Sequence, residues 1–191
     1  MNTFEHLFCS SSLWRYMSRR HVLPWVLSDS CLGEHILELG AGYGAATGFL
    51  SERVARVTSL EYDVKSLSQL RMRHPGNTIA AVAGDASRLP FGDQSFSSAF
   101  AGLVLHHLKS RELQDRAFQE VFRVLRPGGV FVALEIVESW IHHVGHIGST
   151  YTPLSPDSAF ARLAKVELSP VTLDFRPGVF RVIATRPLDL K

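Results

Sequence analysis

The chain has 191 residues, of which 46% are hydrophobic and 20% charged, and its formal net charge at pH 7 is +2. This length and composition predict one globular domain with its own core and exclude a disordered chain. The small net charge gives no sign of a surface for nucleic acid or for an anionic membrane. Two cysteines, Cys9 and Cys31, are too few for a disulfide scaffold, which favours a reducing, cytoplasmic location. Because the apolar runs are short, we expect neither a secretion signal nor a membrane span.

Apolar strands and amphipathic helices alternate along the chain, which is typical of an α/β protein with a parallel sheet. In the first half we expect one or two short helices over 13–27 interrupted at Pro24, a strand at 35–39, a helix at 45–54, a strand at 57–60, a helix at 64–73 and a strand at 78–82. In the second half we expect a strand at 96–104, a helix capped by Ser110 and ended by Arg126-Pro127-Gly128-Gly129, a strand at 130–137, a helix near 158–164 and strands at 166–175 and 179–184. The last two strands predict a closing antiparallel hairpin.

A glycine-rich loop follows the first predicted strand, where Gly40, Gly42 and Gly44 alternate with Ala41 and Tyr43. Glycines let the backbone turn tightly and approach a ligand without an intervening Cβ. The helix behind the loop offers backbone N–H groups at its N-terminus. Taken alone, the loop is also compatible with a tight turn that binds nothing.

Two acidic residues stand at the ends of the next strands. Glu61 ends the second strand and Asp85 follows the third. The carboxyl ends of parallel strands lie at one edge of a sheet, so the glycine loop and both acids are expected around one ligand. A carboxylate can accept hydrogen bonds from ribose hydroxyls or from an adenine amino group. Either acid alone is equally compatible with a solvated strand end, but the combination predicts a nucleoside site.

These residues resemble the class I S-adenosylmethionine (SAM)-dependent methyltransferases, in particular the methyltransferase 11 type. The matching segments, between about Ile36 and Val137, are Leu37–Gly44, Gly84-Asp85-Ala86, Leu89-Pro90-Phe91, Asp93–Phe96, Leu105–Leu108, and Glu120 with Arg126–Gly129. The family commonly has Asp where Ser97 stands, and we expect this position to shape the start of the strand. The resemblance implies a Rossmann-like three-layer α/β sandwich with a mostly parallel seven-stranded sheet whose last strand is antiparallel.

The resemblance also implies which residues bind the cofactor, SAM. The methionine end would be held by Glu38 and by the loop residues Gly40, Ala41, Gly42 and Gly44, with Gly102 and Leu103 close by. The adenosyl end would be held by Glu61 at the ribose, Tyr62 beside the adenine, Asp85 at its amino group and the Ala86 N–H nearby.

Histidines and N-terminal aromatic residues suggest a place for the acceptor. His106, in the Leu105–Leu108 motif, is a candidate general base, although helix packing explains it as well. His142 and His146 have the i, i+4 spacing of metal ligands, but no third ligand is evident and Gly145 weakens a helix, so we expect no metal. We expect His142, His146 and Tyr16 to line the acceptor pocket; Tyr16, like Trp14, could instead simply pack.

The sequence therefore predicts a SAM-dependent methyltransferase formed by a single domain over 1–191, with an N-terminal helical cap at 1–30 and a substrate lid at 138–160. The expected partner is a small-molecule acceptor, with neither nucleic acid nor membrane involved, and the sequence specifies neither the acceptor atom nor the oligomeric state. One alternative is an NAD-dependent oxidoreductase, because Gly40, Gly42 and Ala45 fit a loose Gly-x-Gly-x-x-Ala pattern. The other is a protein that binds SAM without catalysis. The acids Glu38 and Asp85 argue against the oxidoreductase.

Overall fold

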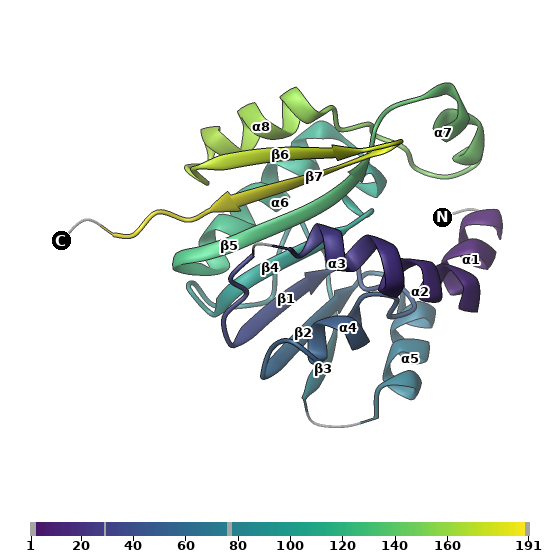
Figure 1. Ribbon diagram of the computed structural model, residues 1–191, viewed down its shortest axis with the longest axis horizontal. Coiled ribbons are helices and arrows are strands. Elements are labelled where there is room, and N and C mark those ends of the chain that lie inside the picture. The colour runs from purple at the N-terminus through teal and green to yellow at the C-terminus, as the bar shows by residue number, and fades with distance from the viewer. Residues whose placement is uncertain (1–2, 29, 76–77, 190–191) are drawn as a thin grey trace.

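The computed structural model describes residues 3–28, 30–75 and 78–189 and is built on a seven-stranded sheet of order β3-β2-β1-β4-β5-β7-β6 (Figure 1). The strands are β1 (His35–Leu39), β2 (Arg56–Glu61), β3 (Ile79–Ala83), β4 (Phe96–Gly102), β5 (Leu125–Ile136), β6 (Val171–Arg176) and β7 (Val179–Thr185). The pairs among β1 to β5 are parallel, whereas β7 is antiparallel to both β5 and β6. The predicted fold class and closing hairpin are confirmed, and the strand order reverses between β1 and β4, where α/β sheets bind ligands.

Helices cover both faces of the sheet. They are α1 (Thr3–Ser10), α2 (Ser12–Met17), η1 (Ser18–Val22), α3 (Leu23–Val26), α4 (Thr47–Ser51), α5 (Val64–Arg73), η2 (Leu105–His107), α6 (Arg111–Val124), α7 (Trp140–Gly145) and α8 (Pro156–Lys165). The helices α6 and α8 cover one face, and α3 and α4 cover the other (Figure 1). Both α1 and α7 lie beyond the carboxyl ends of the parallel strands, which is the edge where the site was predicted.

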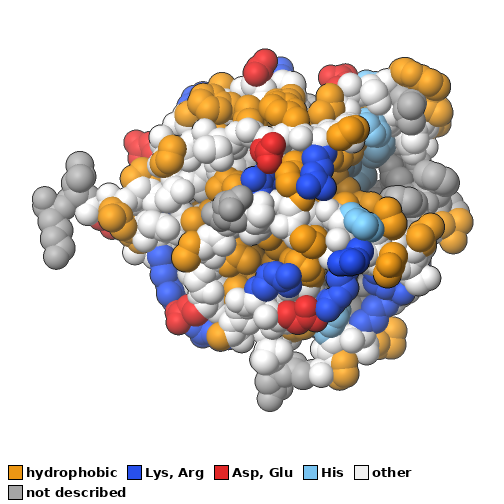
Figure 2. All heavy atoms as spheres, in the orientation of Figure 1, with side chains coloured by type: hydrophobic (Ala, Val, Ile, Leu, Met, Phe, Trp, Pro, Cys, Tyr) orange, Lys and Arg blue, Asp and Glu red, His pale blue; other side chains and the backbone are white. Residues whose placement is uncertain are grey.

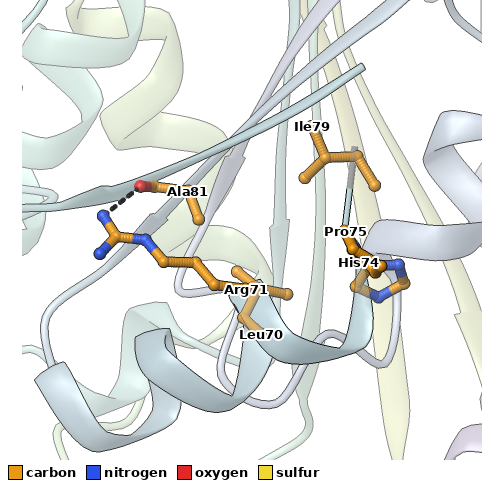
Figure 3. Close-up of a pocket in the computed structure, with 6 residues that line it drawn as sticks. All are labelled: Leu70, Arg71, His74, Pro75, Ile79 and Ala81. Atoms are coloured by element: carbon orange, nitrogen blue, oxygen red, sulfur yellow. Dashed lines mark hydrogen bonds between the residues drawn. The ribbon is translucent and has the colours of Figure 1, made fainter. Parts of the chain in front are cut away.

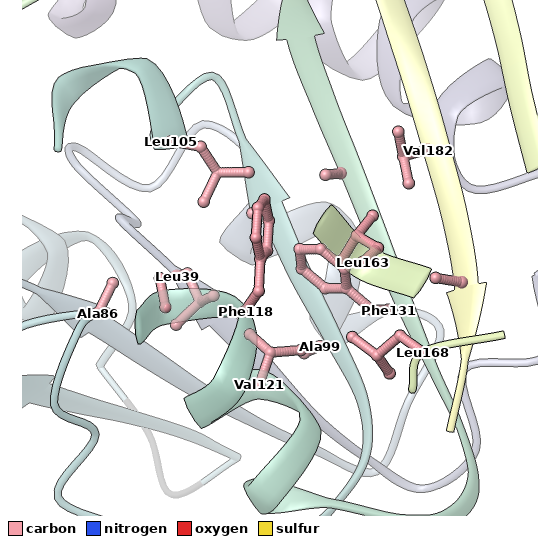
Figure 4. Close-up of a cluster of buried hydrophobic side chains, with 14 of the residues drawn as sticks. Leu39, Ala86, Ala99, Leu105, Phe118, Val121, Phe131, Leu163, Leu168 and Val182 are labelled. Atoms are coloured by element: carbon pink, nitrogen blue, oxygen red, sulfur yellow. The ribbon is translucent and has the colours of Figure 1, made fainter. Parts of the chain in front are cut away.

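Alternation along β1 divides its side chains between two buried clusters. Leu37 and Leu39 pack toward α6, where Phe118 lies at the centre of the larger cluster (Figure 4). Ile36 points to the opposite face and packs with residues of α3 and α4. Because β1 is buried on both faces, the glycine loop that follows it begins from a fixed position.

Local signals in the sequence set most helix ends. The Ser110 hydroxyl accepts a hydrogen bond from Leu113 N (3.3 Å) at the start of α6, as predicted. Pro24 does not interrupt the helix: it is the second residue of α3, which continues directly from the π-helix η1, and Leu23 N donates to the carbonyl of Ser18.

The fifth strand starts earlier than expected. It begins at Leu125, directly after α6, rather than at 130. Leu125 pairs with Phe96 and Val130 pairs with Ser98, so the register shifts between these pairs and the intervening Arg-Pro-Gly-Gly segment forms an irregularity within the strand. The Pro-Gly-Gly segment, which in a sequence usually indicates a turn, therefore forms a bulge within β5.

The free edge of β3 is partly covered by α5. A guanidinium N–H of Arg71 donates to the carbonyl of Ala81 at 2.8 Å (Figure 3). The two residues border a hollow of about 240 Å³ that also includes Ile79, the first residue of β3. This hollow thus lies along the strand rather than beyond its carboxyl end. Among the residues that the structure describes, no helix is both long and apolar enough to cross a bilayer.

Candidate active site

Direct hydrogen bonds join the glycine loop to the ends of β2 and β3. The Glu61 carboxylate accepts from Gly42 N (2.7 Å) and from Asp63 N (2.8 Å). The backbone carbonyl of Glu61 accepts from Gly84 N (3.1 Å), and Asp85 is the next residue. The structure therefore brings Gly42, Glu61 and Asp85 to one edge of the sheet, as the strand order requires.

The glycines of the loop differ in what surrounds them. Gly40, Gly42 and Gly44 all have positive φ angles, of +64°, +53° and +82°. A Cβ on Gly40 would overlap the Val104 side chain, whereas a Cβ on Gly42 would meet no heavy atom within 4 Å. The side of the loop at Gly42 is therefore open, and a ligand can approach its backbone closely.

Glu38 lies buried beneath this loop, with a relative exposure of 2%. One of its carboxyl oxygens accepts hydrogen bonds from the hydroxyls of Thr47 and Ser59, both at 2.6 Å. Burial raises the pKa of Glu38 to about 7, the two hydroxyls oppose that shift, and the nearby charge of Glu61 adds to it. A cation that entered beside Glu38 would favour the ionised carboxylate.

The adenine-side residues occupy the ends of β2 and β3. The Tyr62 side chain is 74% exposed next to Glu61, which leaves an aromatic face available at the edge of the sheet. One oxygen of Asp85 accepts from both the N–H and the hydroxyl of Ser87, at 2.8 Å each. Ala86 is buried. These contacts fix the Asp85 carboxylate at the carboxyl end of β3.

The end of β4 completes this edge. Gly102 is its last residue, and Leu103 follows with a φ angle of +56°, which is rare for a branched side chain. Leu103 N donates to the carbonyl of Leu134 at 2.8 Å, and the next residue, Val104, contacts Gly40. Such strained backbone is often found at functional sites.

Immediately after this turn, a buried glutamate holds His106. Glu135 of β5 accepts from His106 Nδ1 at 2.6 Å, and from the backbone N–H groups of Val104 and Leu105 at 3.1 and 2.7 Å. Both partners are buried. A carboxylate can only accept here, so Nδ1 of His106 carries a hydrogen, and in the neutral form of the ring the lone pair lies on Nε2.

Further aromatic side chains surround His106. Its ring centroid lies 4.2 Å from that of His107, 5.2 Å from that of His146 and 5.9 Å from that of Tyr151. His146 follows α7, so the segment after β5 does come back over the end of β4. Figure 2 shows histidine side chains at this edge of the molecule, next to apolar and basic ones.

The other predicted acceptor residues are placed differently. His142 Nδ1 hydrogen-bonds to the carbonyl of Val137 at 2.9 Å, within its own segment. Tyr16 lines a hollow of about 400 Å³ that also includes Phe49 and Arg53, beside α4. The N-terminal segment does reach the glycine loop, but through α1, where His6 Nδ1 lies 2.8 Å from the Tyr43 hydroxyl.

Comparison with known proteins now adds to this geometry. A family model described as a methyltransferase domain matches residues 37–133, just over half of the chain. The chain belongs to the methyltransferase domain family. The match runs from the middle of β1 to β5 and so contains the glycine loop, Glu61, Asp85 and the turn at Leu103.

Individual relatives of this methyltransferase domain agree with that assignment. A protein of Mycolicibacterium smegmatis named "Probable S-adenosylmethionine-dependent methyltransferase" is 35% identical over 118 residues, or 61% of this chain and 44% of that protein. A fatty-acid O-methyltransferase of the same species is 37% identical over 102 residues, or 52% of this chain and 36% of the relative. The chain thus spans less than half the length of either relative.

A solved structure shares the fold. The SAM-dependent methyltransferase of Mesorhizobium loti superimposes with a TM-score of 0.72, covering 90% of this chain and 100% of the other at 17% identity. The methyltransferase fold therefore accounts for the sheet, its antiparallel strand and the helices on both faces.

The residues present fit the cofactor of this family, SAM. The open side of Gly42 gives the ligand access to the loop backbone. Beneath it, the buried carboxyl of Glu38 suits a cationic amino group, and the carboxylates of Glu61 and Asp85 are acceptors for hydroxyl and amino hydrogens. The expectation of a nucleoside site is consistent with this set of groups.

Several residues of the site were not predicted from the sequence. Thr47 and Ser59 orient Glu38, but isolated hydroxyl residues carry no signal in a sequence. Glu135 could have been found, because it is the only polar residue in the otherwise apolar run 130–137. Tyr151 lies in an irregular segment and carried no signal.

Proposed function

We propose that the chain transfers a methyl group from SAM to a small-molecule acceptor. The observation that carries this proposal is the hydrogen-bonded junction of Gly42, Glu61 and Gly84. It joins the glycine loop, which follows β1 beside the switch point, to the two carboxylates at the ends of β2 and β3. The whole junction lies within the segment that matches the methyltransferase domain.

The cofactor would lie along the carboxyl ends of β1 to β4. Glu61 would accept from the ribose hydroxyls, Asp85 from the adenine amino group, with Ala86 N–H nearby, and Tyr62 would cover the adenine face. The methionine end would lie between the glycine loop (Gly40–Gly44) and the turn at Gly102 and Leu103, with its ammonium group toward Glu38. When bound, SAM supplies a methyl group already activated by its sulfonium, so the protein mainly aligns the acceptor and excludes water.

His106 is the group that we propose to accept a proton from the acceptor. Glu135 fixes its Nδ1–H, so Nε2 carries the lone pair that can take a hydrogen from an O–H, N–H or S–H group. Its position two residues after Val104, which lies next to Gly40, supports a role near the proposed methionine end of the cofactor site. An acceptor that is already ionised needs no such step.

We propose that residues 138–160 cover the acceptor and that residues 1–30 cover the cofactor. In the first segment the side chains of Trp140 and Val144 are 75% and 55% exposed, which suits an apolar acceptor. The fatty-acid O-methyltransferase among the relatives acts, by its name, on a fatty acid, whose hydrocarbon chain is apolar. The net charge of +2 favours such an acceptor over nucleic acid, and the cysteine content favours a cytoplasmic location.

Calorimetric titration of the full chain with SAM and, separately, with NADH tests the proposal against the oxidoreductase alternative. We expect saturable binding of SAM and of S-adenosylhomocysteine, and none of NADH, because the buried Glu38 carboxyl suits the ammonium group of SAM, which NADH lacks. Tight binding of NADH without SAM binding would overturn the assignment. Release of S-adenosylhomocysteine with any acceptor would exclude the non-catalytic alternative.

The raised pKa of Glu38 predicts a pH dependence of SAM binding. Below pH 7 the buried carboxyl is mostly protonated in the cofactor-free protein, whereas the SAM ammonium group favours the ionised form. Binding therefore releases a proton, and affinity should rise roughly tenfold between pH 5.5 and 7.0. Glu38→Gln should bind SAM more weakly at all pH values and lose this rise. A rise of the same size in Glu38→Gln would show that another group titrates.

The raised pKa of Glu38 also affects the stability of the cofactor-free protein, but here the rise in pH lowers the stability. The folded pKa of Glu38 lies above the ordinary value of 4.5, so the folded state binds more protons than the unfolded state between these two values. Its stabilising contribution is complete below pH 4.5 and is lost as the pH rises through about 7. Chemical denaturation at pH 5 and pH 8, with Glu38→Gln as the control, measures this contribution.

A further inference from the structure

We propose that His106, His107 and His146 form a binding site for a divalent transition-metal ion of the zinc type. One ring nitrogen from each of the three residues lies within 4.8 Å of the other two. Histidine is the commonest protein ligand for metal ions, and three histidines with an open fourth position are a known arrangement of catalytic zinc. The expectation of no metal considered only His142 and His146, whereas the structure joins His146 to two histidines from η2.

The hydrogen bonds at the Nδ1 atoms favour this use of the three rings. Nδ1 of His106 contacts the Glu135 carboxylate at 2.6 Å, Nδ1 of His107 the carbonyl of Thr150 at 3.2 Å, and Nδ1 of His146 the carbonyl of His142 at 2.6 Å. Each partner is an acceptor, so each neutral ring carries its hydrogen on Nδ1 and its lone pair on Nε2. Metal-binding histidines are usually held in this way, by a carboxylate or carbonyl at the other nitrogen.

The elements that carry the rings limit their movement. His106 and His107 are neighbours in η2, whose backbone is bound to Glu135 of the central strand β5. His146 follows directly after α7, and its N–H donates to the carbonyl of His142 at 3.1 Å. An ion would therefore join the segment after β5 to the end of β4, beside the proposed cofactor site.

Tyr151 supplies a second observation at the same place. Its hydroxyl is buried and has no hydrogen-bond partner among the residues that the structure describes. The ring stacks on His146, with centroids 4.5 Å apart and planes 23° from parallel. A buried unpaired hydroxyl calls for a missing ligand or water. An oxygen bound at the fourth position of the ion, from water or from the acceptor, is a suitable partner.

This inference extends the proposed function without depending on SAM binding. Nε2 of His106 cannot bind an ion and accept a proton at once. In the metal-loaded protein the ion, and not His106, would therefore promote loss of the acceptor's proton, because coordination lowers the pKa of a bound hydroxyl or thiol group. The acceptor proton then leaves to solvent, and the oxygen or sulfur can attack the methyl carbon as the bond to the sulfonium breaks.

Zinc titration of the full, chelator-treated chain without an affinity tag tests the site. By calorimetry we expect one equivalent of Zn²⁺ to bind, and with Co²⁺ we expect the visible absorption of a four-coordinate nitrogen site. His146→Ala should weaken zinc binding at least tenfold, and Glu135→Gln, which keeps the acceptor oxygen but removes the charge, should weaken it by about 10- to 100-fold.

His143→Ala is the matched control. His143 is also in α7, but its ring is 53% exposed and contacts Glu138. It packs edge-on against Tyr151, with centroids 5.0 Å apart, and is not one of the three clustered histidines, so its removal should change zinc affinity less than twofold. Where His146→Ala does not fold, by circular dichroism, His107→Gln replaces it in the comparison. The site is excluded if no saturable zinc binding occurs, or if His143→Ala and His146→Ala weaken it equally. SAM titrations of the same samples separate the two proposals. A protein that binds zinc but not SAM would overturn the proposed function and leave the metal site in place.

Discussion

Replacement of Glu61 by Ala is expected to weaken SAM binding by about 10- to 100-fold. A hydrogen bond to a charged group contributes about 1.5–3 kcal/mol, and each 1.4 kcal/mol changes affinity about tenfold. In the structure the carboxylate accepts hydrogen bonds from Gly42 N and Asp63 N. Its removal should therefore also make the glycine loop, which the cofactor is proposed to contact, less well ordered. Glu61 is only partly buried at the end of β2, and its loss should therefore leave the protein folded.

Isothermal titration calorimetry with SAM and with S-adenosylhomocysteine measures this effect. Asp189→Ala is the matched control, because it removes an acid from an exposed position near the end of the chain. Its SAM affinity should equal that of the unmodified protein. Thermal denaturation of both variants checks that they are folded. Unchanged affinity in Glu61→Ala would contradict the ribose assignment.

The fold was predictable because both strands and helices have clear periodicity in this chain. The boundaries of β1 and α5 agree with the predicted ranges, and those of β4 differ only at its end. In each case a short apolar run or an amphipathic stretch lies between glycine, proline or capping residues. The sequence signal failed at Arg126–Gly129, because a Pro-Gly-Gly segment normally ends an element, whereas here it is taken up as an irregularity within β5.

The cofactor side of the site was predictable for a different reason. Gly42, Glu61 and Asp85 each follow or end a parallel strand, and the topology alone brings such positions to one edge. No knowledge of side-chain packing is needed for that step.

The acceptor side was not predictable, because long-range packing of irregular segments places its residues. Spacing along the chain paired His142 with His146, but the helix ends at Gly145 and His146 instead lies against His106, 40 residues earlier in the chain. Tyr16 has helical neighbours that predict burial of one face, yet it is 61% exposed beside α4. The place of Tyr16 in the acceptor pocket stays a prediction.

Gly40→Ala is expected mainly to lower the stability of the protein, and Gly42→Ala mainly to lower its affinity for SAM, although both glycines have positive φ angles. An alanine in this conformation costs about 1–2 kcal/mol in either variant. In Gly40→Ala the added methyl group also overlaps Val104, and such overpacking costs a further 1–3 kcal/mol or so. This variant should therefore lose about 2–5 kcal/mol of unfolding free energy. Urea denaturation measures the loss, and the double variant Gly40→Ala/Val104→Ala should be more stable than the sum of its single changes predicts.

Gly42→Ala should instead lose less stability than Gly40→Ala, and its main effect should be a loss of SAM affinity. Its new methyl group meets no protein atom within 4 Å, so only the backbone cost of about 1–2 kcal/mol applies. That open space is where the methionine end of SAM is proposed to lie, and a Cβ there should reduce SAM affinity at least tenfold in calorimetry. If Gly42→Ala binds SAM normally, the space beside the loop is not the cofactor site. If instead it is as unstable as Gly40→Ala, the glycine serves the fold, because the two positions differ chiefly in what a methyl group would touch.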